Sequence, residues 1–491
     1  MAAQFFRHWI LSAIVTGLLC FISCGKKDLP ENPKRPDPRD ANFAVEIGDS
    51  KIPYIVIYPS EDIQNEPKVP AEMHLYVEKQ LVQTNQIGIE YRGSTSFRLS
   101  DKKSFGIETW DASGNDLNAS FFNWPEEEDW ILMGDVVNLQ DGYAFDPTLM
   151  YHHFGYELSR QIGKYASRTQ FVEFELDGEY LGIYVFMEKL KKDGDRIDIA
   201  TLKDTDIEGE ELTGGYILKI DKTAGGAENA GKPLEYFLNN WQDDARYTAL
   251  NSFRSDYDIF GNIIEFGPYG EPYHSNQFLE TYFIYEYPDQ AEIKAEQKAY
   301  IQSYIREFEQ ALLTDDFSSE NRTYPNYIDI NSFIDYFLIN EICRNIDAYR
   351  LSTYITKDKN GKLAMGPVWD LNIGYYNTDR IPINDWVINY NQYVESDAWM
   401  VPFWWPRLME DPQFRAALKV RWQSLSGSTM SVQNLHAIVD ETANLLIDNG
   451  AIERNNRVWA IGGESYEQSI TNLKNYLSER VTWMDNEISG F

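Results

Sequence analysis

Short apolar runs separated by turns dominate the first half of the chain. Their length and their content of β-branched and aromatic residues predict strands, and the Asp177-Gly178 pair between two such runs predicts a hairpin. The expected strands cover residues 52–58, 73–77, 87–91, 104–108, 171–176, 180–189 and 216–221, and a strand also ends the acidic and aromatic loop 124–133. One helix is expected at 147–162. This half of the chain therefore predicts a β-rich lobe.

The second half changes to helical periodicity. Apolar residues recur every three or four positions in residues 293–313 and 332–345, and Ser332 with Asp335 resembles a capping box at the start of the second helix. Further helices are expected at 412–425, 431–449 and 464–488. Residues 226–290 are expected to form an insertion or a substrate-facing flap, and within them 233–290 are rich in aromatic residues with little periodicity. The loop 375–405 is also rich in aromatic residues. The whole chain thus predicts an α+β protein with a helical second lobe.

A hairpin connects two aspartates in the helical half. Asp347 follows the second helix, a strand is expected at 351–357, Asn360-Gly361 lies in the turn, and the chain returns through 362–369 to Asp370. A hairpin returns to its own start, so the two aspartates are expected in one place. Two convergent carboxylates suit a hard divalent cation and leave one carboxylate free to orient a hydroxyl. The alternative is that each aspartate only ends its own element, as aspartate commonly does.

Composition and charge restrict the possible partners. The hydrophobic share of 43% and the aromatic share of 14% are typical of a folded protein. Acidic residues outnumber basic residues by 77 to 44, which gives a net charge of −33. Such a surface repels nucleic-acid backbones and anionic membranes, so we expect no nucleic-acid partner. It favours cations, sugars or basic polypeptides, unless the charge serves solubility alone.

The N-terminal 24 residues resemble a bacterial lipoprotein signal. A weakly basic start precedes an apolar run at 10–22 that is short for a membrane span, and Ser23 stands before Cys24. Cleavage before Cys24 removes residues 1–23 and leaves a lipidated tether at 24–42. The charged residues directly after Cys24, Lys26 to Asp28, resemble the surface-export signals of Bacteroidetes lipoproteins. We therefore expect a lipid-anchored protein of the cell envelope, at the periplasmic or surface face of the outer membrane. An ordinary secretory peptide or a single-pass anchor is the alternative. Cys343 then has no disulfide partner and is expected as a small buried hydrophobe.

Seven segments, taken in order, resemble the spore-coat protein H (CotH) kinase-like family. They are RGSTS (92–96), KKSFGIE (102–108), DWILMGD (129–135), FVEFELDGEYLGIYVFMEKL (171–190), GGYILKID (214–221), NIDAYRLSTYITKD (345–358) and GPVWDLN (366–372). The resemblance implies an atypical, reduced protein-kinase-like fold. Its β-rich N-lobe is expected at 43–225 and its helical C-lobe at 291–491, with ATP and Mg²⁺ or Mn²⁺ between them.

The resemblance also implies roles for residues of the hairpin. Protein kinases place a catalytic aspartate before a hairpin that ends at a metal-binding aspartate. By this match Asp347 orients or deprotonates the acceptor hydroxyl, Asp370 holds the metal, and Asn372 is a second metal ligand. Neither usual kinase motif is present, since Asn-Ile-Asp replaces His-Arg-Asp and Asp-Leu-Asn replaces Asp-Phe-Gly.

Several cations are available for the nucleotide phosphates. We rank Lys103 first and Arg92 second, because both lie in segments that resemble the family and belong to the β-rich lobe. Lys189 competes for the same role, and Glu188 is available to pair with one of these cations.

The resemblance implies an atypical kinase that transfers phosphate from ATP to serine or threonine of a secreted or surface protein. Tyr184 and Trp369 are candidates for stacking on adenine, but packing in the core is the favoured role for each. The alternative function is a non-catalytic surface protein for adhesion or glycan capture on the same fold. Its support is the lipidated terminus and the aromatic-rich stretches, whose rings can stack on sugars. Retention of both aspartates favours the enzyme, because a binding protein does not need that pair.

Overall fold

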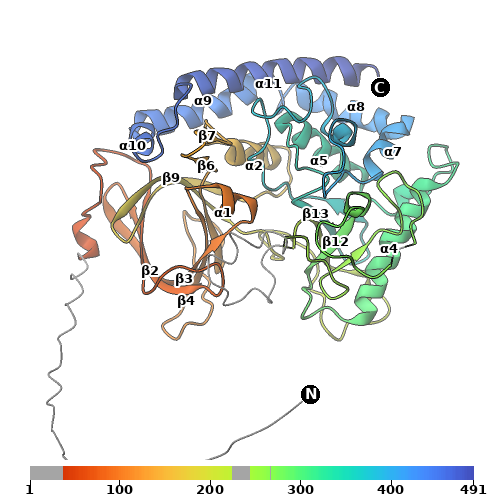
Figure 1. Cartoon of the computed structure of the whole chain (residues 1–491), viewed down its shortest axis with the longest axis horizontal. Helices are drawn as coiled ribbons and strands as arrows, with labels where there is room; N and C mark the ends of the chain where they lie inside the picture. The colour runs from red at the N-terminus through yellow and green to blue at the C-terminus, as the bar shows by residue number, and fades with distance from the viewer. Residues whose placement is uncertain (1–36, 224–243, 266) are drawn as a thin grey trace, which may run out of the picture.

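A closed barrel of seven strands forms the first part of the chain (Figure 1). The computed structural model describes residues 37–223, 244–265 and 267–491. The strand order is β1-β2-β3-β4-β5-β9-β8, and a parallel pairing of β1 with β8 closes the barrel. The strands are β1 (Tyr54–Pro59), β2 (Val69–Val77), β3 (Gln80–Arg92), β4 (Ser104–Trp110), β5 (Asp129–Met133), β8 (Thr169–Leu176) and β9 (Glu179–Glu188). The strands predicted for this part of the chain are thereby confirmed, whereas their closure into a barrel was not predicted.

Both faces of β8 are buried along most of its length, so apolar and polar residues do not alternate cleanly along this strand. Val172 and Phe174 lie in the apolar barrel core. The intervening residues face outward, where Phe171 packs under the helices. Glu173 on the same outer face accepts two hydrogen bonds of 2.7 Å from Arg454, and both side chains are buried. Glu173, a charged residue among the apolar residues of β8, therefore marks the point where the helix that carries Arg454 packs on the barrel.

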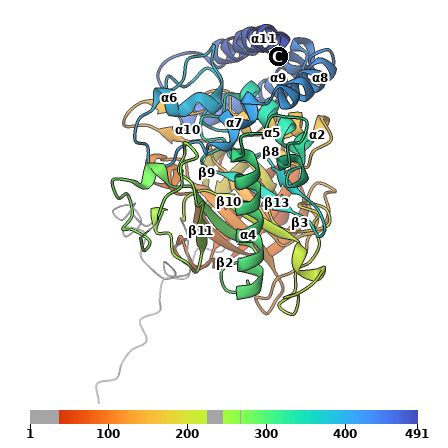
Figure 2. The same cartoon turned by 90° about the vertical axis from the view of Figure 1, so that its right-hand side faces the viewer.

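The predicted hairpin belongs to a second sheet of five strands. The sheet order is β11-β12-β10-β13-β14, and all its neighbours are antiparallel. Its strands are β10 (Tyr216–Ile220), β11 (Ser252–Arg254), β12 (Tyr282–Tyr287), β13 (Thr353–Lys357) and β14 (Leu363–Met365). Helix α4 (Ala295–Leu313) runs along this sheet (Figure 2). Because β11 and β12 are built into the sheet, the region expected as an insertion or flap also contributes regular structure.

Helices cover one end of both sheets (Figure 1). They are α1 (Thr95–Leu99), α2 (Tyr151–Gln161), α5 (Ile330–Cys343), α6 (Tyr390–Tyr393), α7 (Trp404–Glu410), α8 (Pro412–Ser426), α9 (Val432–Asp448), α10 (Ala451–Val458) and α11 (Tyr466–Ser489). Short 3₁₀ turns lie at Pro38–Asp40, Glu211–Thr213, Gln277–Leu279, Tyr324–Asn326 and Val387–Asn389, and a small ribbon pairs β6 (Val137–Asn138) with β7 (Tyr143–Ala144). The α+β class predicted from the sequence is confirmed.

Helix α5 is the central helix, and its start differs from the prediction. From Ser332 to Cys343 all of its residues are buried. The predicted capping box at Ser332 is wrong. Asp329 is the N-cap, and its carboxylate accepts a hydrogen bond from the backbone N–H of Asn331. The Ser332 hydroxyl instead donates to the Asp329 carbonyl. The true cap lies three residues earlier because the continuous apolar pattern begins only at Phe333, after Asn331 and Ser332 in the first turn.

The predicted lipoprotein signal, including Cys24, lies in residues 1–36, outside the described residues. Among the helices of the described part of the chain, none combines the length and the apolar character needed to cross a membrane. Cys343 is buried, and burial raises the pKa of its thiol to about 12. This agrees with its prediction as a small buried hydrophobe.

A buried ion pair joins the central helix to the C-terminal helix, and we predict a large loss of stability when it is broken. Glu341 and Arg480 have fully buried side chains, with 2.9 Å between Oε2 and Nη2. Arg480→Met leaves the carboxylate buried without its cation, which we expect to lower the free energy of unfolding by about 3–5 kcal/mol in urea denaturation. Arg306→Met, which breaks a half-exposed pair with Asp256, is the control and should cost less than about 1 kcal/mol. Equal losses in the two variants would contradict the prediction.

Candidate active site

A cavity of about 540 Å³ lies where the barrel meets the second sheet. This volume is typical of a pocket for a small molecule. Its lining comes from the end of β3, the start of α1, the end of β10, the loop after α5, the start of β13 and the segment after β14. The polar residues that matter for the chemistry are Arg92, Lys222, Asp347, Arg350, Asp370 and Asn372.

The structure brings both hairpin aspartates to this cavity. Asp347 follows the C-cap of α5, and Asp370 lies where the chain has returned through β13 and β14. The pKa of Asp370 is raised to about 6, first by burial and then by the negative charge of Asp347, while the charge of Arg92 opposes both. The two carboxylates therefore interact electrostatically, and a cation beside them would relieve their repulsion.

Asp347 is held by a buried arginine. Arg350 Nη2 lies 2.5 Å from Asp347 Oδ1, and the arginine side chain is only 1% exposed. Its other nitrogens donate to the carbonyls of Ile346 and Trp399, and its guanidinium stacks 4.0 Å from the ring centre of Tyr390. Asp347 Oδ2 forms no hydrogen bond within the described part of the chain. The aspartate thus has one oxygen fixed and one oxygen available to a ligand.

Asn372 supplies an oxygen atom without a partner. The residue is 7% exposed, and its Oδ1 is buried with no hydrogen bond to any described residue. A buried acceptor without a partner is costly and calls for an explanation, such as an ion that the site binds. Carboxylate and amide oxygens are the ligands that Mg²⁺ and Mn²⁺ prefer. The donor set of Asp370 and Asn372 therefore fits a hard divalent cation.

Two cations face the cavity with little competition from other partners. The Arg92 guanidinium forms no hydrogen bond or ion pair with any residue that the structure describes, and it lies 5.8 Å from the ring centre of Trp369. Lys222 Nζ donates to Thr95 Oγ1 at 2.6 Å. Lys222 was missed from the sequence, although its position directly after Asp221 at the end of a predicted strand was a usable signal. An anionic ligand in this cavity would meet Arg92 and Lys222.

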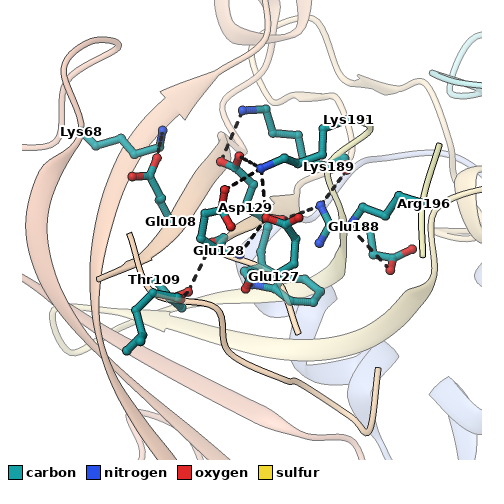
Figure 3. Close-up of polar contacts among 12 residues, drawn as sticks. Lys68, Glu108, Thr109, Glu127, Glu128, Asp129, Glu188, Lys189, Lys191 and Arg196 are labelled. Carbon is teal, nitrogen blue, oxygen red and sulfur yellow. Dashed lines mark hydrogen bonds and ion pairs between the residues drawn. The ribbon is translucent and has the colours of Figure 1, made fainter. Parts of the chain in front are cut away.

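Lys103, Glu188 and Lys189 are not brought to the cavity. Lys103 Nζ donates to the carbonyls of Phe97 and Ser100, at 2.7 and 2.6 Å. Glu188 is buried and pairs with Arg168. Lys189 lies 3.3 Å from Asp129 on the barrel wall (Figure 3). Each of the three residues has a structural partner, and none of them lines the cavity.

A second acidic cluster lies on the barrel, away from the cavity. The carboxylates of Glu127, Glu128 and Asp129 gather within 4.8 Å of one another. Figure 3 shows Lys191 reaching into this group, and its Nζ lies 3.0, 2.6 and 3.2 Å from the three carboxylates in that order. The Lys191 ammonium group already lies within 3.2 Å of all three carboxylates, where a cation would bind, so we do not assign a metal to the cluster.

The aromatic candidates divide between the cavity and the core. Trp369 lines the cavity and stacks on Tyr156 with ring centres 5.9 Å apart. Tyr184 is buried in the barrel core, and its hydroxyl donates to the Lys103 carbonyl. Of the two, only Trp369 is available to a ligand in the cavity.

Comparison with known proteins identifies one protein family that the chain matches. The model of one family, described as CotH kinase protein, matches residues 89–484, which is most of the chain. The match includes the end of β3, both hairpin aspartates and the C-terminal helices. A search of the curated proteins found no match.

Proposed function

The chain belongs to the CotH kinase protein family, and we propose that it transfers phosphate from ATP to a serine or threonine hydroxyl of a secreted or surface protein, with Mg²⁺ or Mn²⁺. The observation that carries this proposal is the shared cavity, in which two interacting carboxylates, an unpartnered amide oxygen and two cations meet. We further propose that the barrel and the helical layer correspond to the two lobes of an atypical kinase, with the nucleotide between them.

The residues of the cavity divide the work of phosphate transfer. Asp370 and Asn372 would hold the divalent cation, which when bound neutralises charge on the phosphates. Arg92 and Lys222 pair with the phosphate oxygens. Asp347 accepts the proton of the substrate's serine or threonine hydroxyl. The hydroxyl oxygen forms a bond to the γ-phosphorus of ATP, while the bond between the γ-phosphorus and the oxygen that leaves with ADP breaks. Arg350 keeps Asp347 in place for this step.

The aromatic-rich stretches give little support to the alternative function, a non-catalytic surface protein that captures glycans. The large aromatic residues of the loop 375–405 are mostly buried: Tyr375, Trp386, Trp399, Trp404 and Trp405 are each less than 10% exposed. Several aromatic residues of the described part of 233–290 also pack inward, among them Tyr247, Phe253, Tyr282 and Phe283, whereas Phe260 is 66% exposed and Trp241 lies outside the described residues. Buried rings cannot stack on a sugar, so these residues favour a core role over glycan capture.

The test of the proposal is transfer of labelled γ-phosphate from ATP, with Mn²⁺ or Mg²⁺, to the chain itself or to a basic serine-rich peptide. We expect labelling by the wild type, and a fall of about a hundredfold in Arg92→Ala, which loses a preorganised cation. Lys103→Ala is the matched control in the same lobe and should stay near the wild-type rate, because its ammonium group faces backbone carbonyls. A wild type that neither labels nor binds nucleotide in a metal-dependent way would overturn the proposal.

A further inference from the structure

The backbone at Asp370 needs support from outside the hairpin. Its φ of 52° lies in the left-handed region, which is uncommon for residues other than glycine and costs about 1 kcal/mol or more. The backbone pairing of the hairpin does not supply that support: β14 ends at Met365, and the last backbone hydrogen bond to β13 runs from the Gly366 N–H to the Tyr354 carbonyl, four residues before Asp370. The Asp370 carboxylate has a side-chain hydrogen bond with Ser352. Since the direction of a side chain also follows from its backbone, whatever holds this φ helps to aim the carboxylate.

Two side chains of α2 hold the backbone at this point. The N–H of Asp370 donates to the hydroxyl oxygen of Tyr156 at 3.3 Å, and the N–H of Leu371 donates to His152 Nδ1 at 3.3 Å. Tyr156 and His152 are 0% and 2% exposed, so neither contact competes with bulk water. The two residues are four positions apart and therefore share one face of the helix.

The same helix also contacts the residues on either side. The Tyr156 ring stacks on Trp369 at an interplanar angle of 18°. Gly155 lies so close to Leu371 that a Cβ on the glycine would be 2.1 Å from Leu371 Cδ1. Three successive residues, Trp369 to Leu371, are thus held by one turn of α2.

We propose that Tyr156 and His152 are positioning residues, which fix the backbone of Asp370 and Leu371 and thereby aim the Asp370 carboxylate at the divalent cation. This inference rests on the proposed function, since it assumes that Asp370 binds metal. Groups that orient metal ligands commonly change metal affinity 10- to 100-fold when they are removed. Without the two acceptors, the segment is free to relax toward negative φ, which turns the carboxylate out of its place.

The first test measures the affinity of the full chain for Mn²⁺ alone, from the electron paramagnetic resonance signal of free Mn²⁺. We expect Tyr156→Phe and His152→Leu to raise Kd about tenfold. His152→Asn keeps an acceptor near the position of Nδ1 and should restore the affinity to within about twofold of the wild type. Tyr476→Phe is the matched control: it removes a buried tyrosine hydroxyl that donates to the Ile342 carbonyl, and its Kd should equal that of the wild type.

The second test follows hydrogen exchange of residues 366–374 in the same variants without metal. Faster exchange at Asp370 and Leu371 in Tyr156→Phe and His152→Leu, with no change in Tyr476→Phe, supports the proposal. Unchanged exchange and unchanged Mn²⁺ affinity in these variants overturn it. A wild type that binds no Mn²⁺ overturns the metal site of the proposed function, and the exchange measurement then still decides whether α2 holds this segment.

Discussion

Asp370→Ala is expected to lower metal-dependent phosphate transfer by about a thousandfold or more, which is the scale of losing a preorganised charge in a transition state. The carboxylate lines the cavity beside Asp347, and the interaction of their charges favours a bound cation. The variant removes the strongest ligand of the proposed metal set and leaves Asn372 as a neutral one. The labelling assay with ATP and Mn²⁺ measures the rate, and titration with Mn²⁺ measures the accompanying loss of metal affinity.

The control for this variant lies on the same hairpin. Asp358 is in the turn between β13 and β14, where its carboxylate accepts hydrogen bonds from the backbone N–H groups of Ala200 and Lys359. Asp358→Ala therefore removes an aspartate from the hairpin without touching the cavity, and its labelling rate should stay within a few-fold of the wild type. Labelling that survives Asp370→Ala unchanged would rule out the site assignment even if the protein is a kinase.

Asp347→Asn is expected to lower the transfer rate by about 10²- to 10⁴-fold, the usual contribution of a general base. The amide keeps the size of the side chain, but it cannot take the proton of an acceptor hydroxyl. Binding of Mn²⁺ and nucleotide should change far less than the rate, since the metal role is assigned to Asp370. Single-turnover labelling and nucleotide titration on the same preparation separate the two effects.

Asp397 provides a control for disturbance of the polar contacts around Arg350. Asp397 also lines the cavity and lies 3.4 Å from Arg350, and its carboxylate accepts a hydrogen bond from Tyr390. Asp397→Asn should weaken this network while leaving the proton acceptor intact, so its loss of rate should be much smaller. If Asp397→Asn and Asp347→Asn lose the same activity, Asp347 acts through Arg350 and not on the acceptor.

Metal binding by Asp370 is expected to depend on pH. Asp370 has a pKa of about 6 in the metal-free protein, first because of its burial and then because of the nearby charge of Asp347. A metal ligand must be deprotonated, so protonation competes with the cation below pH 6. The same burial that places the carboxylate in the cavity therefore makes its ligand function depend on mildly acidic or neutral conditions.

The sequence by itself determined the local elements and the partnership of the two aspartates. Each predicted strand and helix depends on periodicity over a few residues, and the hairpin between Asp347 and Asp370 depends on one turn. Chain connectivity alone carries Asp370 back toward Asp347, because fewer than 25 residues separate them and two strands of a hairpin run in opposite directions. Such interactions are local, so they are visible in the order of residues.

Only the tertiary structure decided which other residues line the cavity with Asp347 and Asp370. Lys103 and Arg92 both lie in segments that resemble the family, yet Arg92 ends β3 and Lys103 lies just before β4, so no strand alternation shows where their side chains point. Lys102 enters the barrel, Lys103 turns to nearby carbonyls, and the Arg92 guanidinium faces the cavity. The hydrogen bond from the Asp370 N–H to the Tyr156 hydroxyl joins residues 214 positions apart. Closure of the barrel and docking of α2 create these contacts, and no periodic pattern encodes them because they depend on packing between distant elements.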